Sequence, residues 1–232
     1  MTPALQAIVF DFDGVIANSE PLHLKAFQRA LAEEGMTLEA GDYFTRYLGY
    51  DDVGVFETIA RDRELGWTAR HITDLVARKG LKLQALIDDG EILFPGAPAF
   101  IRAAAAEVPI AIASGALRHE ILQILEAAAL DQLFQTIVAS GDTPESKPSP
   151  GPYLLAFEKL QQRAAETLEP RRCVAIEDSV WGLESARQAG LRCVGVTTSY
   201  AADELRGAEL VVEGLHALTL PMLEAVVRRG PG

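Results

Sequence analysis

Two aspartates follow an apolar run near the start of the chain, in the segment Ile8-Val9-Phe10-Asp11-Phe12-Asp13-Gly14-Val15. In an extended chain, residues two apart point to the same side, so the carboxylates of Asp11 and Asp13 would crowd together. Like charges at such short range cost free energy unless a cation or a polarised substrate offsets them. The spacing therefore favours nucleophilic or acid-base chemistry, and the alternative is an ordinary turn at Asp13 and Gly14.

Three further apolar runs also end in polar residues. These are Ser114 and Gly115 after residues 110–113, Lys147 in the loop after residues 136–139, and Glu177 and Asp178 after residues 173–176. Short continuous apolar runs are typical of strands that are buried on both faces of a parallel sheet. Ligand sites in such sheets lie outside the carboxyl ends of the strands, near the point where the strand order reverses. We therefore expect these polar groups to meet at one edge of a sheet.

The ordered set of motifs resembles the haloacid dehalogenase superfamily, in its phosphatase and β-phosphoglucomutase-like branch, over essentially the whole chain. The motifs are Asp11-Phe12-Asp13-Gly14-Val15, Ala113-Ser114-Gly115, Lys147-Pro148-Ser149-Pro150 and Ile176-Glu177-Asp178-Ser179. Each motif is weak by itself, but four in this order and strand context give a strong signal. The resemblance implies an α/β fold, with a doubly wound parallel-sheet (Rossmann-like) core and a helical cap inserted after the first strand. Many relatives carry an aspartate where this chain has Asn18, a departure that we expect to be peripheral.

The resemblance also implies a catalytic role for four of these residues. Asp11 would be the nucleophile that forms an aspartyl phosphate, and Asp13 would protonate the leaving group and later deprotonate water. Dehalogenase relatives that attack carbon lack the second aspartate, so Asp13 indicates phosphoryl transfer. Lys147 would supply a fixed positive charge, and Ser114 would offer its hydroxyl to the phosphate.

A Mg²⁺ site follows from the same resemblance, since this ion prefers carboxylate oxygens, phosphate oxygens and water. The protein ligands would be Asp11, the backbone carbonyl of Asp13, and Asp178. Glu177 would contact the ion directly or through water. The alternative for Asp178 is to cap the next helix, a role that Ser179 could also take.

Four further residues are candidates for binding phosphate or substrate. Gly14 and Gly115 would place backbone N–H groups beside the phosphate. His23 resembles a histidine of many relatives, and Lys79 a lysine of mutase relatives. The alternatives are a histidine at the surface or core edge and a solvated helix lysine.

Helical spacing dominates the segment after the first strand, where residues 20–35, 42–60 and 68–88 are predicted as helices. They predict a helical cap at residues 18–93 between two parts of the core, at residues 1–17 and 94–232. Strands and helices then alternate, as in a doubly wound sheet with right-handed crossovers. The further helices are expected at residues 117–128, 152–165 and 180–189, and the further strands at 192–197 and 210–212.

Composition and charge argue against several classes of partner. A net charge of −12 disfavours nucleic acid and anionic membrane surfaces. The sequence has neither a stretch of roughly twenty apolar residues, as a membrane helix needs, nor a recognisable signal peptide. Cys173 and Cys193 are expected to be free and buried, with a disulfide or metal pair as the alternative. We therefore expect a cytoplasmic monomer.

Three functions are compatible with these motifs. The first is a Mg²⁺-dependent phosphatase acting on a small phosphorylated metabolite, such as a sugar phosphate or phosphoglycolate. The second is a β-phosphoglucomutase-like phosphosugar mutase, and the third a non-enzymatic, receiver-like phospho-acceptor. Receiver domains are much shorter and carry their aspartate on a later strand. A mutase needs cap cations for a second phosphate, whereas residues 47–52 contain two acids and no arginine or lysine, which leaves Lys79. Hydrolysis is therefore the prediction.

Overall fold

The computed structural model describes residues 5–47, 50, 52–89 and 92–229. The chain forms two compact units, which we call the core unit (Met1–Asn18 and Leu93–Gly232) and the insertion unit (Ser19–Ile92). The insertion unit leaves the core unit after the first strand, as the sequence predicts. The domain boundaries at 17/18 and 93/94 stay a prediction, because compactness alone does not show that either unit folds independently.

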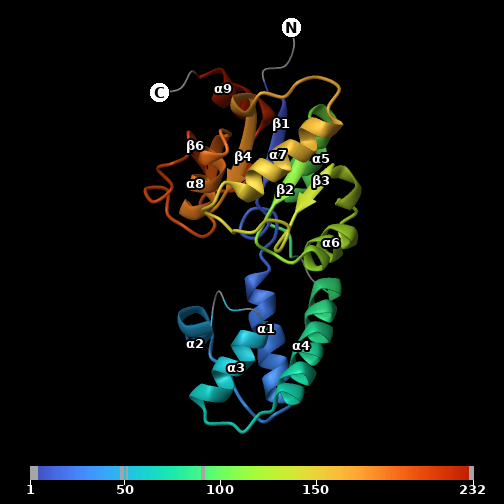
Figure 1. Ribbon diagram of the computed structural model, residues 1–232, viewed down its shortest axis with the longest axis vertical. Coiled ribbons are helices and arrows are strands. Elements are labelled where there is room, and N and C mark those ends of the chain that lie inside the picture. Colours follow the sequence, from blue (N-terminus) through green and yellow to red (C-terminus); the bar gives the residue numbers. More distant parts are fainter. Residues whose placement is uncertain (1–4, 48–49, 51, 90–91, 230–232) are drawn as a thin grey trace. The chain divides into compact units, whose positions relative to one another are not determined.

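The core unit is built on a six-stranded sheet in which all neighbouring strands are parallel (Figure 1). The strands are β1 (Ala7–Phe10), β2 (Ile110–Ala113), β3 (Thr136–Val138), β4 (Cys173–Glu177), β5 (Arg192–Val196) and β6 (Leu210–Val212). Their order is β3-β2-β1-β4-β5-β6, so the winding direction reverses at β1, between β2 and β4. Phe10 at the end of β1 is in register with Ile112 on one side and Ile176 on the other. This confirms the α/β class, and it puts β1 and β4 side by side where ligands bind such sheets.

The two faces of the sheet carry side chains of different size, because neighbouring residues of a strand point to opposite faces. Helices α7 (Gly151–Arg163) and α8 (Val180–Gln188) pack against the face with small side chains. These are Ala7, Val9, Ala111, Ala113, Cys173, Ala175 and Cys193. On the other face, the ring of Phe10 meets those of Phe100 and Phe134 edge-on. Burial of both faces explains why the strands are continuous apolar runs.

Three more helices complete the core unit: α5 (Ala97–Glu107), α6 (Arg118–Ala127) and α9 (Leu220–Arg228). The sequence prediction did not include α9. Both cysteines are buried and free, as predicted. Over the part of the chain that the structure describes, no helix is long and apolar enough to cross a lipid bilayer.

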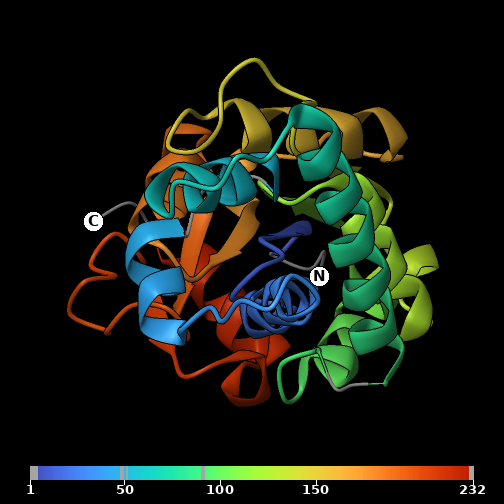
Figure 2. The same ribbon diagram turned by 90° about the horizontal axis from the view of Figure 1, so that it is seen from below.

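The insertion unit is entirely helical over its described residues. It contains α1 (Glu20–Ala32), α2 (Ala40–Asp42), a π-helical turn (Tyr43–Tyr47), α3 (Asp52–Asp62) and α4 (Ala69–Asp89). The last of these, α4, is the long teal helix in Figure 2. The prediction of a single α-helix over residues 42–60 is therefore wrong near its start, where residues 43–47 form the π-helical turn. Tyr43 and Tyr47, at the two ends of the π-helical turn, are both buried in a cluster with Phe27 and Phe56. Their packing overrides the α-helical spacing of the sequence.

Candidate active site

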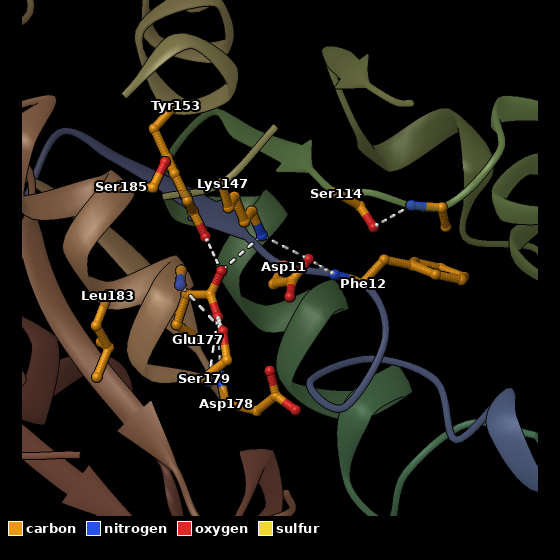
Figure 3. A network of polar contacts seen from close by, with 12 residues as sticks. Asp11, Phe12, Ser114, Lys147, Tyr153, Glu177, Asp178, Ser179, Leu183 and Ser185 are labelled. Atoms are coloured by element: carbon orange, nitrogen blue, oxygen red, sulfur yellow. Dashed lines mark hydrogen bonds and ion pairs between the residues drawn. The ribbon is translucent and has the colours of Figure 1, made fainter. Parts of the chain in front are cut away.

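The polar residues singled out in the core unit lie together at the carboxyl edge of the sheet (Figure 3). Strand β1 ends at Phe10, so Asp11 is the first residue beyond it rather than its last residue. Ser114 directly follows β2, and Glu177 is the last residue of β4. Asp11, Ser114, Glu177 and Asp178 are all buried. The edge of the sheet thus combines a hydroxyl with three carboxylates, in a place largely removed from water.

Lys147 joins two of these strand ends through its ammonium group. Its Nζ lies 2.9 Å from Oδ1 of Asp11 and 2.6 Å from Oε1 of Glu177. Burial disfavours the charged ammonium and by itself would lower the pKa of Lys147. The negative charges of Asp11 and Glu177 have a larger combined effect and raise this pKa above its ordinary value. The lysine is therefore a cation held between these two carboxylates.

The carboxylates carry more negative charge than one lysine can offset. Burial, and then the charge of Glu177, raise the pKa of Asp11 well above its ordinary value. Burial also raises the pKa of Asp178 to about 6, against the opposing effect of a hydrogen bond from Ser199. Each of the three acids offers one oxygen, and these oxygens lie within 4.8 Å of one another. Such a set of hard oxygen ligands with excess negative charge fits a divalent cation such as Mg²⁺.

Glu177 differs from the other two acids because both of its oxygens already accept hydrogen bonds. Oε1 accepts from Lys147 and, at 2.8 Å, from the hydroxyl of Tyr153. Oε2 accepts from the hydroxyl of Ser179 at 3.0 Å and from the backbone N–H groups of Asp178 and Ser179. This fully buried carboxylate is thus an anchor for three chain segments, while Asp11 and Asp178 have more capacity for a metal.

Asp178 is free for such a role because it does not cap the following helix. The N-cap of α8 is Ser179, whose Oγ accepts from the backbone N–H of Gly182 at 3.0 Å. Asp178 instead accepts a short hydrogen bond from Ser199. Of the two candidates for the cap, the structure therefore selects Ser179, which removes the structural alternative for Asp178.

Two glycines allow the acidic residues to come this close to the backbone. Gly14 has a φ of +80°, and a Cβ there would lie 1.8 Å from Oδ2 of Asp178. In the first turn of α8, a Cβ at Gly182 would lie 1.8 Å from Oε1 of Glu177. Side chains are excluded at both positions. By contrast, a Cβ at Gly115 would meet nothing within 4 Å, so this glycine is not required by packing.

Ser114 and Asp11 are each oriented by a neighbouring backbone N–H group. The hydroxyl oxygen of Ser114 accepts from the N–H of Ala116 at 3.0 Å, so its own hydrogen can be donated to a ligand. Oδ1 of Asp11 accepts from the N–H of Phe12 at 2.7 Å as well as from Lys147. Asp13 is half-buried in the tight turn that follows and forms a β-bridge with Ala17.

Several residues of this site were not found from the sequence: Tyr153, Gly182, Thr198 and Ser199. Thr198 donates to the backbone carbonyl of Gly14, so the loop after β5 is tied to the loop after β1. The rule that picks out polar residues after each strand would have found Thr198 and Ser199 if it had been applied to the fifth strand. No comparable signal marks Tyr153, which lies within a helix.

His23 and Lys79 form a separate polar cluster inside the insertion unit. Lys79 is fully buried, and its Nζ lies 2.7 Å from Oδ1 of Asp52 and 2.9 Å from Nδ1 of His23. The same ammonium lies over the ring of Phe27. Burial, and then the charge of Lys79, lower the pKa of His23 to about 4. Lys79 is thus not the solvated helix lysine of the alternative interpretation, and the roles of both residues in substrate binding stay predictions.

Comparison with known proteins places this arrangement in a wider group. A family model for haloacid dehalogenase-like hydrolases matches residues 5–190. The chain is 31% identical to the protein CbbY of Rhodobacter capsulatus, over 92% of this chain and 95% of that protein. It is 28% identical to a phosphoglycolate phosphatase of Yersinia pestis, covering 87% of this chain and 84% of the relative. It is 26% identical to a phosphorylated carbohydrates phosphatase of Thermotoga maritima, covering 94% and 95%.

Solved structures agree with these sequence matches. The crystal structure of CbbY from Rhodobacter sphaeroides in complex with phosphate has a TM-score of 0.77 and 29% identity, and the alignment covers 95% of this chain and 99% of that one. A mutant of the same protein was crystallised with xylulose-(1,5)bisphosphate and gives a TM-score of 0.74 at 29% identity, covering 94% of this chain and 99% of that one. The fold is therefore shared with a protein that was crystallised with phosphate and, as a mutant, with a sugar bisphosphate.

Proposed function

The chain belongs to the haloacid dehalogenase-like hydrolase family, and from this premise we propose that it is a Mg²⁺-dependent phosphatase that works through an aspartyl phosphate on Asp11. Its substrate is a small phosphorylated metabolite of the sugar phosphate or phosphoglycolate type. The observation that carries the proposal is the contact between Lys147 and Asp11, beside Asp178, at the carboxyl edge of the sheet. A phosphoglycolate phosphatase and a phosphorylated carbohydrates phosphatase among the relatives, and the sugar bisphosphate bound to the CbbY mutant, support the substrate class.

The nucleophile is the carboxylate of Asp11. Its orientation is fixed by the Lys147 ammonium and by the N–H of Phe12, which both bind Oδ1. As the bond from an oxygen of Asp11 to phosphorus forms, the bond from phosphorus to the ester oxygen breaks. This splits hydrolysis into two easier transfers.

Asp13 moves the proton in both transfers. Its carboxylic acid gives a proton to the departing ester oxygen, which leaves as an alcohol. In the second transfer the resulting carboxylate takes a proton from water while the water oxygen attacks phosphorus. The bond from phosphorus to the oxygen of Asp11 breaks at the same time, phosphate is released, and both Asp11 and Asp13 return to their starting states.

Repulsion between the phosphate and the carboxylates has to be offset by positive charge. Asp11, the carbonyl of Asp13 and Asp178 would hold Mg²⁺, which would offset the negative charge of the phosphate with two positive charges. Lys147 supplies the third positive charge, and the hydroxyl of Ser114 donates to a phosphoryl oxygen. The role of Glu177 is to hold Lys147 in place.

Hydrolysis is favoured over a mutase reaction by the surroundings of Lys79. A mutase has to bind the second phosphate of a bisphosphate intermediate with free cations. The ammonium of Lys79 is already paired with Asp52 and hydrogen-bonded to His23 inside the insertion unit. Leu48, Gly49 and Asp51, which belong to the neighbouring stretch without cations, lie outside the described residues.

Phosphate release from a panel of phosphorylated metabolites tests the proposal. The panel contains phosphoglycolate, xylulose 1,5-bisphosphate, and β-glucose 1-phosphate with a trace of its bisphosphate, each with Mg²⁺, with Ca²⁺ and with a chelator. We expect release of phosphate with Mg²⁺ alone. Ca²⁺ should inhibit, because it tolerates bidentate carboxylates and would engage both oxygens of Asp11. Formation of glucose 6-phosphate from β-glucose 1-phosphate with little free phosphate would show that the protein is a mutase. Full activity in the presence of the chelator would exclude a requirement for Mg²⁺.

A further inference from the structure

We infer that Tyr153 is a positioning residue that holds Glu177 on Lys147, and so fixes the lysine ammonium against Asp11 and keeps Glu177 out of the direct coordination shell of the metal. The inference concerns the site of the proposed phosphatase and rests on that function. It adds no catalytic group to the site, but it assigns a task to a helix residue outside the four motifs.

Tyr153 reaches the site from the first turn of α7. The helix begins at Gly151, shortly after the loop that carries Lys147, and Tyr153 is completely buried. Its hydroxyl donates to Oε1 of Glu177 at 2.8 Å. Figure 3 shows the phenol and the lysine ammonium approaching this same oxygen. Tyr153 and Lys147 are therefore linked through one acceptor atom.

The ring of Tyr153 makes a second, direct contact with the lysine. Nζ of Lys147 lies 5.0 Å from the centre of the ring, within the range of a cation–π interaction. A lysine has a flexible four-carbon chain and its ammonium can occupy many positions. Here the ammonium is held by Asp11, by Glu177 and by the ring face, so Tyr153 restrains it in two ways.

Packing alone does not explain a tyrosine at this position. The ring belongs to the hydrophobic cluster with Ala156 and Leu160, where a phenylalanine would bury the same surface. A buried hydroxyl costs free energy unless it is hydrogen-bonded, and its partner here is the anchoring carboxylate. The hydroxyl is thus the part of the side chain that serves Glu177.

The hydroxyl also decides how much of the charge on Glu177 is available to a metal. With the phenol in place, the carboxylate of Glu177 accepts five hydrogen bonds from groups of the protein, and these offset its negative charge. Without the phenol, Lys147 is the one remaining donor to Oε1 of Glu177. The negative charge on this oxygen is then offset less, and it pulls the ammonium of Lys147 away from Asp11. The same change leaves more negative charge for a divalent ion.

The variant Tyr153→Phe tests this, with Tyr47→Phe as a matched control that removes another buried phenol, located in the insertion unit. The measurements are kcat, KM, melting temperature, and calorimetric titration with Mg²⁺ alone. For Tyr153→Phe we expect kcat to fall about tenfold with KM nearly unchanged, as for the loss of one hydrogen bond to a charged group. We expect Mg²⁺ to bind as tightly as in wild type or a few-fold more tightly. The control variant Tyr47→Phe should change neither kcat nor the affinity for Mg²⁺.

Two results would overturn the inference. An unchanged kcat would remove Tyr153 from the positioning of Lys147. A weaker Mg²⁺ affinity in step with the loss of kcat would show that Glu177 is itself a metal ligand. If Tyr153→Phe does not fold, the wild type still decides: the hydroxyl proton of Tyr153, assigned through the ring signals of ¹³C-labelled tyrosine, should exchange slowly with water. Fast exchange of this assigned proton contradicts the hydrogen bond to Glu177.

Failure of the proposed function is a separate result. If the wild type releases phosphate from no member of the panel, the phosphatase proposal fails. The Mg²⁺ titrations of the two variants and the tyrosine spectrum still report on the hydrogen bond and its effect on the metal.

Discussion

Gly182 and Glu177 are so close that a methyl group on Gly182 would stand 1.8 Å from the carboxylate oxygen Oε1. The first turn of α8 thus closes directly over the acid that anchors Lys147. Because backbone and carboxylate are both buried, neither can move away without disturbing the site.

Gly182→Ala is expected to destabilise the protein and inactivate it. Overpacking of this kind costs about 1–3 kcal/mol, and here it displaces the carboxylate that anchors Lys147. The control is Gly80→Ala in α4, where a new Cβ meets nothing within 4 Å and helix propensity improves by about 1 kcal/mol. The same chemical change should therefore lower the melting temperature for Gly182→Ala and raise it for Gly80→Ala. A Gly182→Ala protein with wild-type activity would show that the site tolerates displacement of Glu177.

Asp11→Asn is expected to abolish turnover and leave the fold intact. The carboxamide has a similar volume but cannot attack phosphorus usefully. Since burial and the charge of Glu177 raise the pKa of Asp11, losing its negative charge should not lower the melting temperature. Phosphate release measures the effect. Activity above about a hundredth of wild type would exclude Asp11 as the nucleophile, because loss of a covalent catalyst costs several powers of ten.

Asp13→Asn should behave differently from Asp11→Asn. The nucleophile remains, but the proton shuttle is gone, so the aspartyl phosphate forms from a substrate with a good leaving group and then breaks down slowly. Rapid quenching with an aryl phosphate, followed by mass measurement of the intact protein, should reveal the added phosphoryl group. The double variant Asp11→Asn, Asp13→Asn is the control and should carry none. A rate equal to wild type would remove Asp13 from the mechanism.

Asp178→Ala and Ser179→Ala should separate metal binding from helix capping. Asp178→Ala should raise the Mg²⁺ concentration needed for half-maximal activity by about tenfold or more. Its melting temperature should not fall, because burial disfavours the charged form of Asp178 and raises its pKa to about 6. Ser179→Ala should lower stability by about 1 kcal/mol through the lost N-cap. A collapse in melting temperature for Asp178→Ala alone would mean that its main role is structural.

The imidazole of His23 should stay neutral down to about pH 4, because burial and then the charge of Lys79 lower its pKa. The unfolded chain binds this proton at about pH 6.5, its ordinary value, so stability from His23 is present above pH 6.5 and is lost as the pH falls towards 4. Lys79→Met should raise this pKa. NMR titration of the imidazole measures it, and Lys82→Met on the same helix is the control. A wild-type value near 6.5 would contradict the buried cluster.

The sequence by itself determined the class of fold and which polar residues follow its strands. Strands buried on both faces are continuous apolar runs, and three of the runs lead directly into a polar residue, as Phe10 leads into Asp11 and Ile176 into Glu177. Parallel strands end at the same edge, so the local pattern was enough to bring Asp11, Ser114 and Asp178 together. It was not enough for residues 42–60, where the packing of two tyrosines replaces one helix by shorter pieces.

Only the tertiary structure decided how these groups are held. Tyr153 and Glu177 are 24 residues apart, and Thr198 is 184 residues from Gly14. The periodicity of a sequence records which side of an element is buried, but not which buried atom of another element will lie opposite. That depends on how helices and loops cross the end of the sheet. The tertiary structure therefore decides that Glu177 anchors Lys147, that Ser179 caps α8, and that Lys79 is paired with Asp52.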